Sequence, residues 1–297
     1  MAIRVTQNML NSNMLRNLHN SMYSMDKMQQ QLSSGSKISK PSDDPVVATR
    51  GMFYRSSLME NEQYQRNIGE VQSWLELSDK ALDEAGSIMH RIRELAVNSG
   101  NTTLGPDSLQ AIGKEIEQLK EHLGTITNQT LGGKYIFGGS DIMTPPFDVS
   151  TGKITSTNNS EIMLEVSTGI QVPTNVTGQS VFNFKGNSGQ NVFELMDKVI
   201  GELKAGKPVN SELGNIDEQI DNMLAVRSTL GARANRIELI QDRMEKEEVT
   251  LTEGMSKNED ADIAEVITNL KTQENVHRAA LGAGARIIQP SLLDFLR

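Results

Sequence analysis

A heptad pattern between residues 68 and 96 constrains the fold of this chain most. Apolar or small residues follow one another there at alternating steps of three and four: Ile68, Val71, Leu75, Ser78, Leu82, Ala85, Met89, Ile92 and Ala96. This spacing places all of them on one side of a helix, and its persistence is typical of coiled coils. The pattern predicts a long packed helix that begins near Pro45, with Asp44 as its cap, and ends near residue 99.

Similar spacing predicts five more helices. The first ends at Ser33, Ser34 and Gly35, a helix-stop signal. Another begins at Pro106 and forms an antiparallel hairpin with the long helix. The remaining helices are expected over Val192–Leu203, over about 211–255, and from a cap at Asp260 or Asp262 onward.

The segment between residues 128 and 190 has a different composition, rich in Gly, Thr, Asn, Ser and Pro. Short strands are expected over Tyr135–Phe137, Lys153–Thr155, Glu161–Val166 and Val181–Phe184, separated by glycines and a proline. A small β-rich domain is therefore predicted between helices.

The predicted fold class is mainly α: an elongated rod of antiparallel coiled coil or helical bundle, with a small inserted β-rich domain. The predicted domains are a terminal helix and loop over 1–44, a helical rod in two parts over 45–130 and 191–257, the insert over 131–190, and a C-terminal helix over 258–297. The two terminal helices lack a partner nearby in sequence, and isolated helices of this length are marginal in water. They are expected to be flexible in the monomer and to pair with each other, with the middle helices, or with other molecules.

Composition fits thin helical packing. The chain has 297 residues, with 15 Met against 12 aromatic residues in all (1 Trp, 4 Tyr, 7 Phe). Its net charge of −9 argues against nucleic acid or an anionic membrane as a partner. The start lacks the apolar stretch of a cleaved signal peptide, and no run approaches eighteen apolar residues. The absence of cysteine fits either a cytosolic protein or an extracellular protein without disulfides.

Catalytic chemistry is poorly supported. The four histidines, His19, His90, His122 and His277, fall on different predicted helices without metal-ligand spacing. The glycines before Lys134 lack the rest of a phosphate-binding loop, and no cofactor is expected. The sequence therefore predicts a protein that is not an enzyme.

Candidate interface residues lie on the apolar sides of the two ends. These sides predict an assembly surface made of Leu15, Leu18, Met22, Met25, Leu32, Ile263, Ile267, Leu270, Leu281, Ile288, Leu292, Leu293 and Phe295.

The two ends together resemble the flagellin superfamily. At the N-terminal side the similar residues are Leu32–Gly35, Ile38 and Ser42–Asp44; at the C-terminal side they are Asp260–Ala264, Ile267, Asn269–Leu270 and Ser291–Leu296. The resemblance covers roughly residues 1 to 130 and 210 to 297. Within the superfamily, Gly133–Gly139, Thr144–Phe147 and the opening Arg4–Met9 are similar to the proteins of the hook-filament junction.

The resemblance implies a structural subunit of the bacterial flagellum that joins the hook-side junction protein to the flagellin filament. It further implies self-association in a ring or helical tube, an export chaperone on the C-terminal region, and an extracellular location reached through the flagellar export apparatus without a cleaved signal peptide. Flagellin itself, the filament subunit, is the alternative. A cytosolic coiled-coil scaffold and an enzyme are the alternatives from other functional classes.

Overall fold

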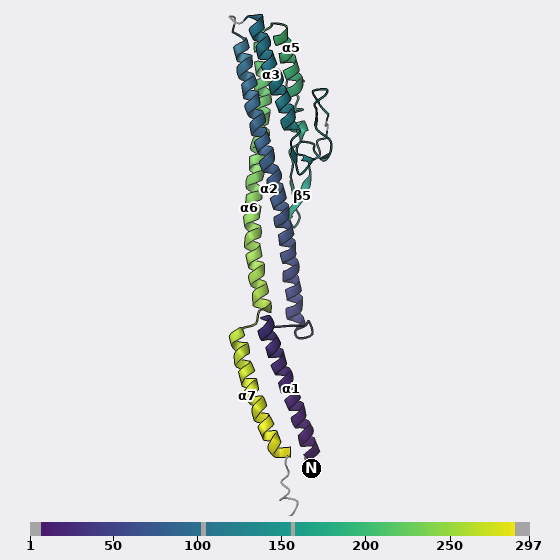
Figure 1. Cartoon of the computed structure of the whole chain (residues 1–297), viewed down its shortest axis with the longest axis vertical. Coiled ribbons are helices and arrows are strands. Elements are labelled where there is room, and N and C mark those ends of the chain that lie inside the picture. The colour runs from purple at the N-terminus through teal and green to yellow at the C-terminus, as the bar shows by residue number, and fades with distance from the viewer. Residues whose placement is uncertain (1–6, 102–104, 156–157, 289–297) are drawn as a thin grey trace, which may run out of the picture. The chain divides into compact units, whose positions relative to one another are not determined.

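The computed structural model describes residues 7–101, 105–155 and 158–288, and helices dominate these ranges (Figure 1). The chain divides into two compact units: a terminal unit of Met1–Glu60 with Glu247–Arg297, and a central unit of Asn61–Lys246. The helices are α1 (Gln7–Ser34), α2 (Pro45–Ser99), α3 (Pro106–Thr127), α4 (Gly178–Val181), α5 (Val192–Lys204), α6 (Leu213–Glu259) and α7 (Ile263–Ile288).

The heptad residues of α2 form the core of the central unit. Each of the nine is at most 3% exposed, which confirms the predicted helix and its buried side. Helix α6 lies antiparallel to α2, because Arg93 pairs with Asp217 at one level and Asn61 donates to the carbonyl of Met244 at another. This pair buries the aliphatic side that the sequence pattern predicts.

Helices α3 and α5 extend the bundle. The predicted hairpin of α2 and α3 is present, with an ion pair of 2.8 Å between Arg91 and Glu115. Helix α5 lies antiparallel to α3, as the ion pairs Lys120–Asp197 and Lys204–Glu117 show. A capping box of Asn191 and Glu194 begins α5, which satisfies two backbone donors that a helix start leaves free.

Between α3 and α5, the described residues form three two-stranded antiparallel ladders. The strands are β1 (Thr130–Leu131) with β2 (Lys134–Tyr135), β3 (Phe147–Asp148) with β4 (Lys153–Ile154), and β5 (Met163–Ser167) with β6 (Ile170–Pro173). Phenylalanine rings join this region to the bundle, since Phe147 stacks on Phe193 of α5 and Phe182 also lies against Phe193, with a centroid distance of 6.4 Å.

The strand predicted over Val181–Phe184 is wrong. Residues 178–181 form the short helix α4, and the amide of Phe182 donates to the carbonyl of Gly178. Val181 and Phe182 are both fully buried although they are consecutive. A strand with one exposed face would bury only one of two neighbours, so the tight turn is what brings both into the core.

Helix α6 also runs four residues further than the sequence suggests, to Glu259. The sequence predicts the end of this helix near Gly254. Gly254 is instead helical and lies close to Tyr54 of α2, where a β-carbon would be 2.8 Å from the ring. Close approach of the two helices accounts for the glycine in place of a turn.

In the terminal unit, α1 and α7 lie side by side and antiparallel (Figure 1). The first helix ends as predicted, because Gly35 adopts a left-handed φ of 72° after Ser34. The loop after α1 pairs with the link between α6 and α7 through an isolated bridge between Ser36 and Asp260. The amide of Ala261 donates to the carbonyl of Gly35 at 2.8 Å, which closes this junction.

Candidate assembly surface

The contact between α1 and α7 is built from two heptad series. Each residue of the two series is partly or fully buried: on α1 they are Asn11, Met14, Leu18, Ser21, Met25 and Met28, and on α7 they are Val266, Leu270, Gln273, His277, Ala280 and Gly284. Steps of three and four place each series on one side of its helix. The two ends of the chain therefore pair with each other, one of the possibilities that the sequence leaves open.

This contact is thin. Among the side chains described in α1 and α7, only Ser21 (8% exposed) and Val266 (9%) are buried. Polar residues sit within it, since Gln273 donates to the hydroxyl of Ser21 at 3.2 Å. Among the described residues, Asn11 Oδ1 and His277 Nδ1 are buried without a hydrogen-bond partner. The pair thus buries little apolar area and leaves polar atoms unsatisfied, so it contributes little stability.

A second apolar stripe lies beside this contact and is open to solvent. On α1 it comprises Leu15 (63% exposed) and Met22 (58%), and on α7 it comprises Ile263 (40%), Ile267 (43%) and Leu281 (49%). At about 100° per residue, the exposed residues of α1 and those of α7 are rotated in the same sense about their helix axes, away from the contact. Because the two helices run antiparallel, this rotation places both groups of residues on the same face of the pair. We call this face the terminal apolar face.

A shallow groove of about 420 Å³ runs along this face between the two helices. Residues of both helices line it: Met25, Gln29, Leu32, Leu270, Glu274, His277 and Arg278. Met25, Leu32 and Leu270 give the groove apolar surface between polar and charged side chains, so it is suited to receive side chains of another protein.

The structure places most of the predicted interface residues on or beside this face. Leu18, Met25 and Leu270 are half-buried between the helices, and Leu32 is 37% exposed. Ile288 closes α7 but its side chain is not described, and Leu292, Leu293 and Phe295 lie outside the described residues. The sequence did not single out Met14, Val266 and Gln273, although the heptad steps from Leu18 and Leu270 would have reached them.

Small residues let the two helices approach each other. A β-carbon at Gly284 would meet the end of the Met14 side chain, so Met14 packs directly over this glycine. The sequence suggested close helix packing at the Gly282–Gly284 segment, and Gly284 has this contact within the chain itself.

The two aspartates of the loop before α2 have a structural role. Asp44 caps the helix as predicted, with its carboxylate accepting from the amides of Val46 (2.9 Å) and Val47 (3.1 Å). The amides of Lys40 and Ser39 donate to Asp43 and lower the pKa of its carboxyl. Both carboxylates are thus held by the backbone, which fixes the turn between α1 and α2.

In the ranges that the structure describes, no three His, Cys, Asp or Glu side chains gather as a metal site. His122 lies 3.2 Å from Glu84 as an exposed pair. Of the helices described, none combines the length and the apolar character that crossing a membrane requires.

Two family models match the chain. The bacterial flagellin N-terminal helical region matches residues 5–141, and the bacterial flagellin C-terminal helical region matches residues 213–296. Both matches include helices of the terminal unit and of the central unit.

Full-length relatives are similar over nearly the whole chain. The flagellar hook-associated protein 3 of Escherichia coli strain K12 is 25% identical over 94% of this chain and 94% of its own length. The flagellin of Bacillus subtilis strain 168 is 24% identical over 92% of each. The solved structure of flagellar hook-associated protein 3 from Legionella pneumophila has a TM-score of 0.62 at 17% identity, over 69% of this chain and 98% of that one, which shows the shared fold.

Proposed function

The chain belongs to the flagellin family, and from this premise we propose that it is a structural subunit of the bacterial flagellum that joins the hook-side junction protein to the flagellin filament. The hook-associated proteins among its relatives support this role over that of flagellin. We assign it no catalytic role and no cofactor. The observation that carries the mechanism is the terminal apolar face, which α1 and α7 build together and whose apolar side chains are exposed to solvent.

Assembly follows from this surface. Every copy carries the same terminal apolar face, and burying one large aliphatic side chain contributes about 1.5–3 kcal/mol. A contact between this face and a different surface of the next copy repeats from subunit to subunit, which gives a ring or a helical tube. The segments 1–44 and 258–297 would then serve assembly, while 45–130 and 191–257 form the rod and 131–190 the insert.

The remaining partners follow from the position in the flagellum. The subunit would contact the hook-side junction protein at one end of its ring and flagellin at the other. A chaperone would cover the C-terminal region before export, since the exposed leucine and isoleucines of α7 would otherwise associate in the cell. The protein would reach the outside of the cell through the flagellar export apparatus, without a cleaved signal peptide.

The location on isolated flagella tests the proposal. Gold-labelled antibody should bind once per flagellum, where the hook meets the filament. A deletion strain should secrete flagellin without attaching it and should not swim. Label along the whole filament would instead support flagellin, the alternative that the Bacillus subtilis relative favours. Growth of long filaments from the purified protein on filament seeds would support the same alternative.

Charged substitutions test the terminal apolar face itself. Leu15→Asp together with Leu281→Asp should abolish attachment of the filament, while the circular dichroism of the monomer stays unchanged because both side chains are exposed. Val149→Asp is the matched control, since Val149 is 77% exposed on the turn between β3 and β4 in the central unit. Normal motility of the double variant would contradict an assembly role for this face.

A further inference from the structure

A second open groove lies in the central unit, between α2 and α6. It encloses about 660 Å³, with Leu75 of α2 and Leu230 of α6 among the residues that line it. Gly231 and Ala234 form part of the α6 wall, and both are exposed. A β-carbon at Gly231 would meet nothing within 4 Å, so no packing inside the chain requires a glycine there. The space above it can accept a side chain from outside.

The walls of this groove carry unbalanced negative charge. Glu76, Glu238 and Asp242 are exposed, and they have no ion pair within the part of the chain that the structure describes. Lys80 is the basic residue of the lining, and Asp79 is already paired with Arg227 at 2.8 Å. Unpaired carboxylates around a depression favour a partner with positive charge.

The same helix presents such a partner surface. Arg236, Leu239 and Arg243 follow at steps of three and four, and Leu239 is 71% exposed. The two arginines are exposed and make no hydrogen bond or ion pair with any residue described here. We call these three residues the basic stripe. It pairs one large apolar side chain with two flanking cations, which matches a groove with apolar floor and acidic walls.

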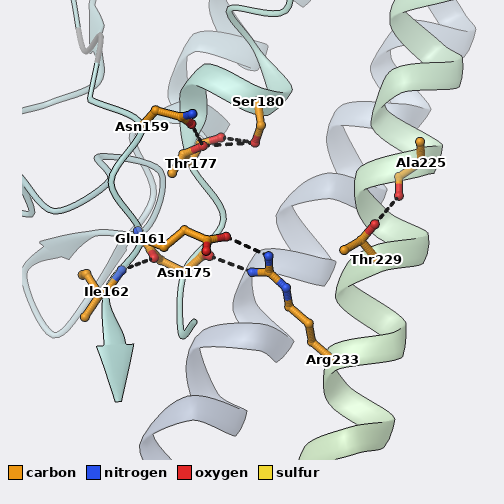
Figure 2. A network of polar contacts seen from close by, with 9 residues as sticks. All are labelled: Asn159, Glu161, Ile162, Asn175, Thr177, Ser180, Ala225, Thr229 and Arg233. Atoms are coloured by element: carbon orange, nitrogen blue, oxygen red, sulfur yellow. Dashed lines mark hydrogen bonds and ion pairs between the residues drawn. The ribbon is translucent and has the colours of Figure 1, made fainter. Parts of the chain in front are cut away.

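The groove and the basic stripe lie on separate faces of α6. At about 100° per residue, Ala234 and Glu238 are turned to one side of the buried Leu230, whereas Leu239 points away from α2. The remaining side faces the insert: Arg233 donates to Glu161 at 2.7 Å and to the carbonyl of Asn175 at 3.3 Å (Figure 2). One copy therefore offers both surfaces at once, and neither is covered by the insert.

We propose that the acidic groove between α2 and α6 receives the basic stripe of a second copy of this chain. Leu239 of one copy would lie over Gly231 and Ala234 of the next, with Arg236 and Arg243 beside Glu238, Asp242 and Glu76. The contact joins two different surfaces, so it repeats from copy to copy in one direction. This inference rests on the proposed self-association and gives the central unit its own part in it.

Disulfide trapping tests the contact in the full-length protein, because the chain has no cysteine of its own. A deletion strain would express two variants together, Leu239→Cys and Ala234→Cys, and isolated flagella would be oxidised. We expect a shift from monomer to the mixed dimer on a non-reducing gel. Each variant carries a single cysteine, so a disulfide within one chain cannot account for the dimer.

Charge reversal makes the test specific. Arg236→Glu with Arg243→Glu in the Leu239→Cys chain should abolish the mixed dimer. Glu238→Lys with Asp242→Lys in the Ala234→Cys chain should restore it. Gln110→Cys, on the exposed side of α3, replaces Ala234→Cys as the control and should give no dimer.

Two results would overturn the inference: protein present at the junction without mixed dimer, or Leu239→Cys chains that pair with each other. The first would leave the proposed function intact. Absence of the protein from isolated flagella would instead overturn the proposed function, and this inference with it.

Discussion

A buried glycine in α3 lies directly against the ring of Phe147, which stacks on Phe193 at a centroid distance of 4.4 Å. A β-carbon at Gly124 would collide with that ring. Gly124→Ala should therefore lower the free energy of unfolding of the central unit by about 1–3 kcal/mol, as overpacking does. Gly201→Ala is the control in α5, where the added carbon meets nothing, and it should raise stability by about 0.5–1 kcal/mol. Urea titrations with equal shifts would contradict the assigned contact.

Glu212, before α6, gives the central unit a dependence on pH. Burial raises the pKa of this carboxyl, but hydrogen bonds from Lys198 (2.7 Å) and Asn215 (2.8 Å), with a third from Ser211, together hold it below its ordinary value. A pKa lower in the folded state stabilises the fold above the unfolded pKa, and this contribution is lost as the pH falls through the folded value.

The variant Glu212→Gln should then cost about 1 kcal/mol at pH 7. The difference between the variant and the parent should shrink as the pH falls through the lowered pKa of the parent carboxyl, where the parent takes up its proton. Urea unfolding of both proteins at a series of pH values measures it. A difference that stays constant into acid would show that the charge of Glu212 does not contribute.

Helix α7 begins at a cap that the sequence leaves open between two aspartates. The structure assigns it to Asp262, whose carboxylate accepts from the amides of Ala264 (3.0 Å) and Glu265 (3.2 Å). Asp260 instead accepts from the hydroxyl of Ser256 in the last turn of α6. Asp262→Ala should destabilise α7 by about 1 kcal/mol, and Asp262→Asn should retain most of the cap. Faster amide exchange over residues 263–266 would report the loss; a larger effect of Asp260→Ala would contradict the assignment.

The helices could be predicted because their signals are local. Heptad spacing, Pro45 after Asp44, and Gly35 after Ser34 each act within one turn of chain, so the ends of α1 and α2 follow from sequence. The element over Val181–Phe184 could not be predicted, because a short apolar run fits a strand or a helix equally well. Its conformation depends on Phe137, which is distant in sequence and lies edge-on to Phe182.

The candidate assembly surface could also be predicted only in part. Sequence spacing identifies an apolar side on α1 and another on α7, but periodicity alone does not say which residues face the partner helix. Leu15 and Leu18 belong to one predicted side, yet Leu18 is half-buried against α7 whereas Leu15 is 63% exposed. The apolar arc is wider than a single contact uses, and this excess width forms the terminal apolar face.

The two compact units differ in how much core they possess. In the central unit the heptad residues of α2 and the Phe cluster are nearly inaccessible to solvent. In the terminal unit, the contact between α1 and α7 has a much smaller core. Among the side chains described there, Val266 is the one aliphatic side chain that is less than 10% exposed. Stability follows buried apolar area, so the terminal helices should open long before the central bundle unfolds.

Limited proteolysis of the monomer should therefore leave a resistant fragment within about residues 45–255, with both ends trimmed. Opening of α1 and α7 costs little in the free subunit, and the same helices should resist the protease once assembly covers the terminal apolar face. Mass spectrometry compares the fragments from the free monomer with those from the same protein in isolated intact flagella. The core variant Leu82→Ala provides the contrast, since emptying a site that is 2% exposed should expose the central unit as well. Equal resistance of the ends and the centre in the free monomer would contradict the difference in stability between the two units.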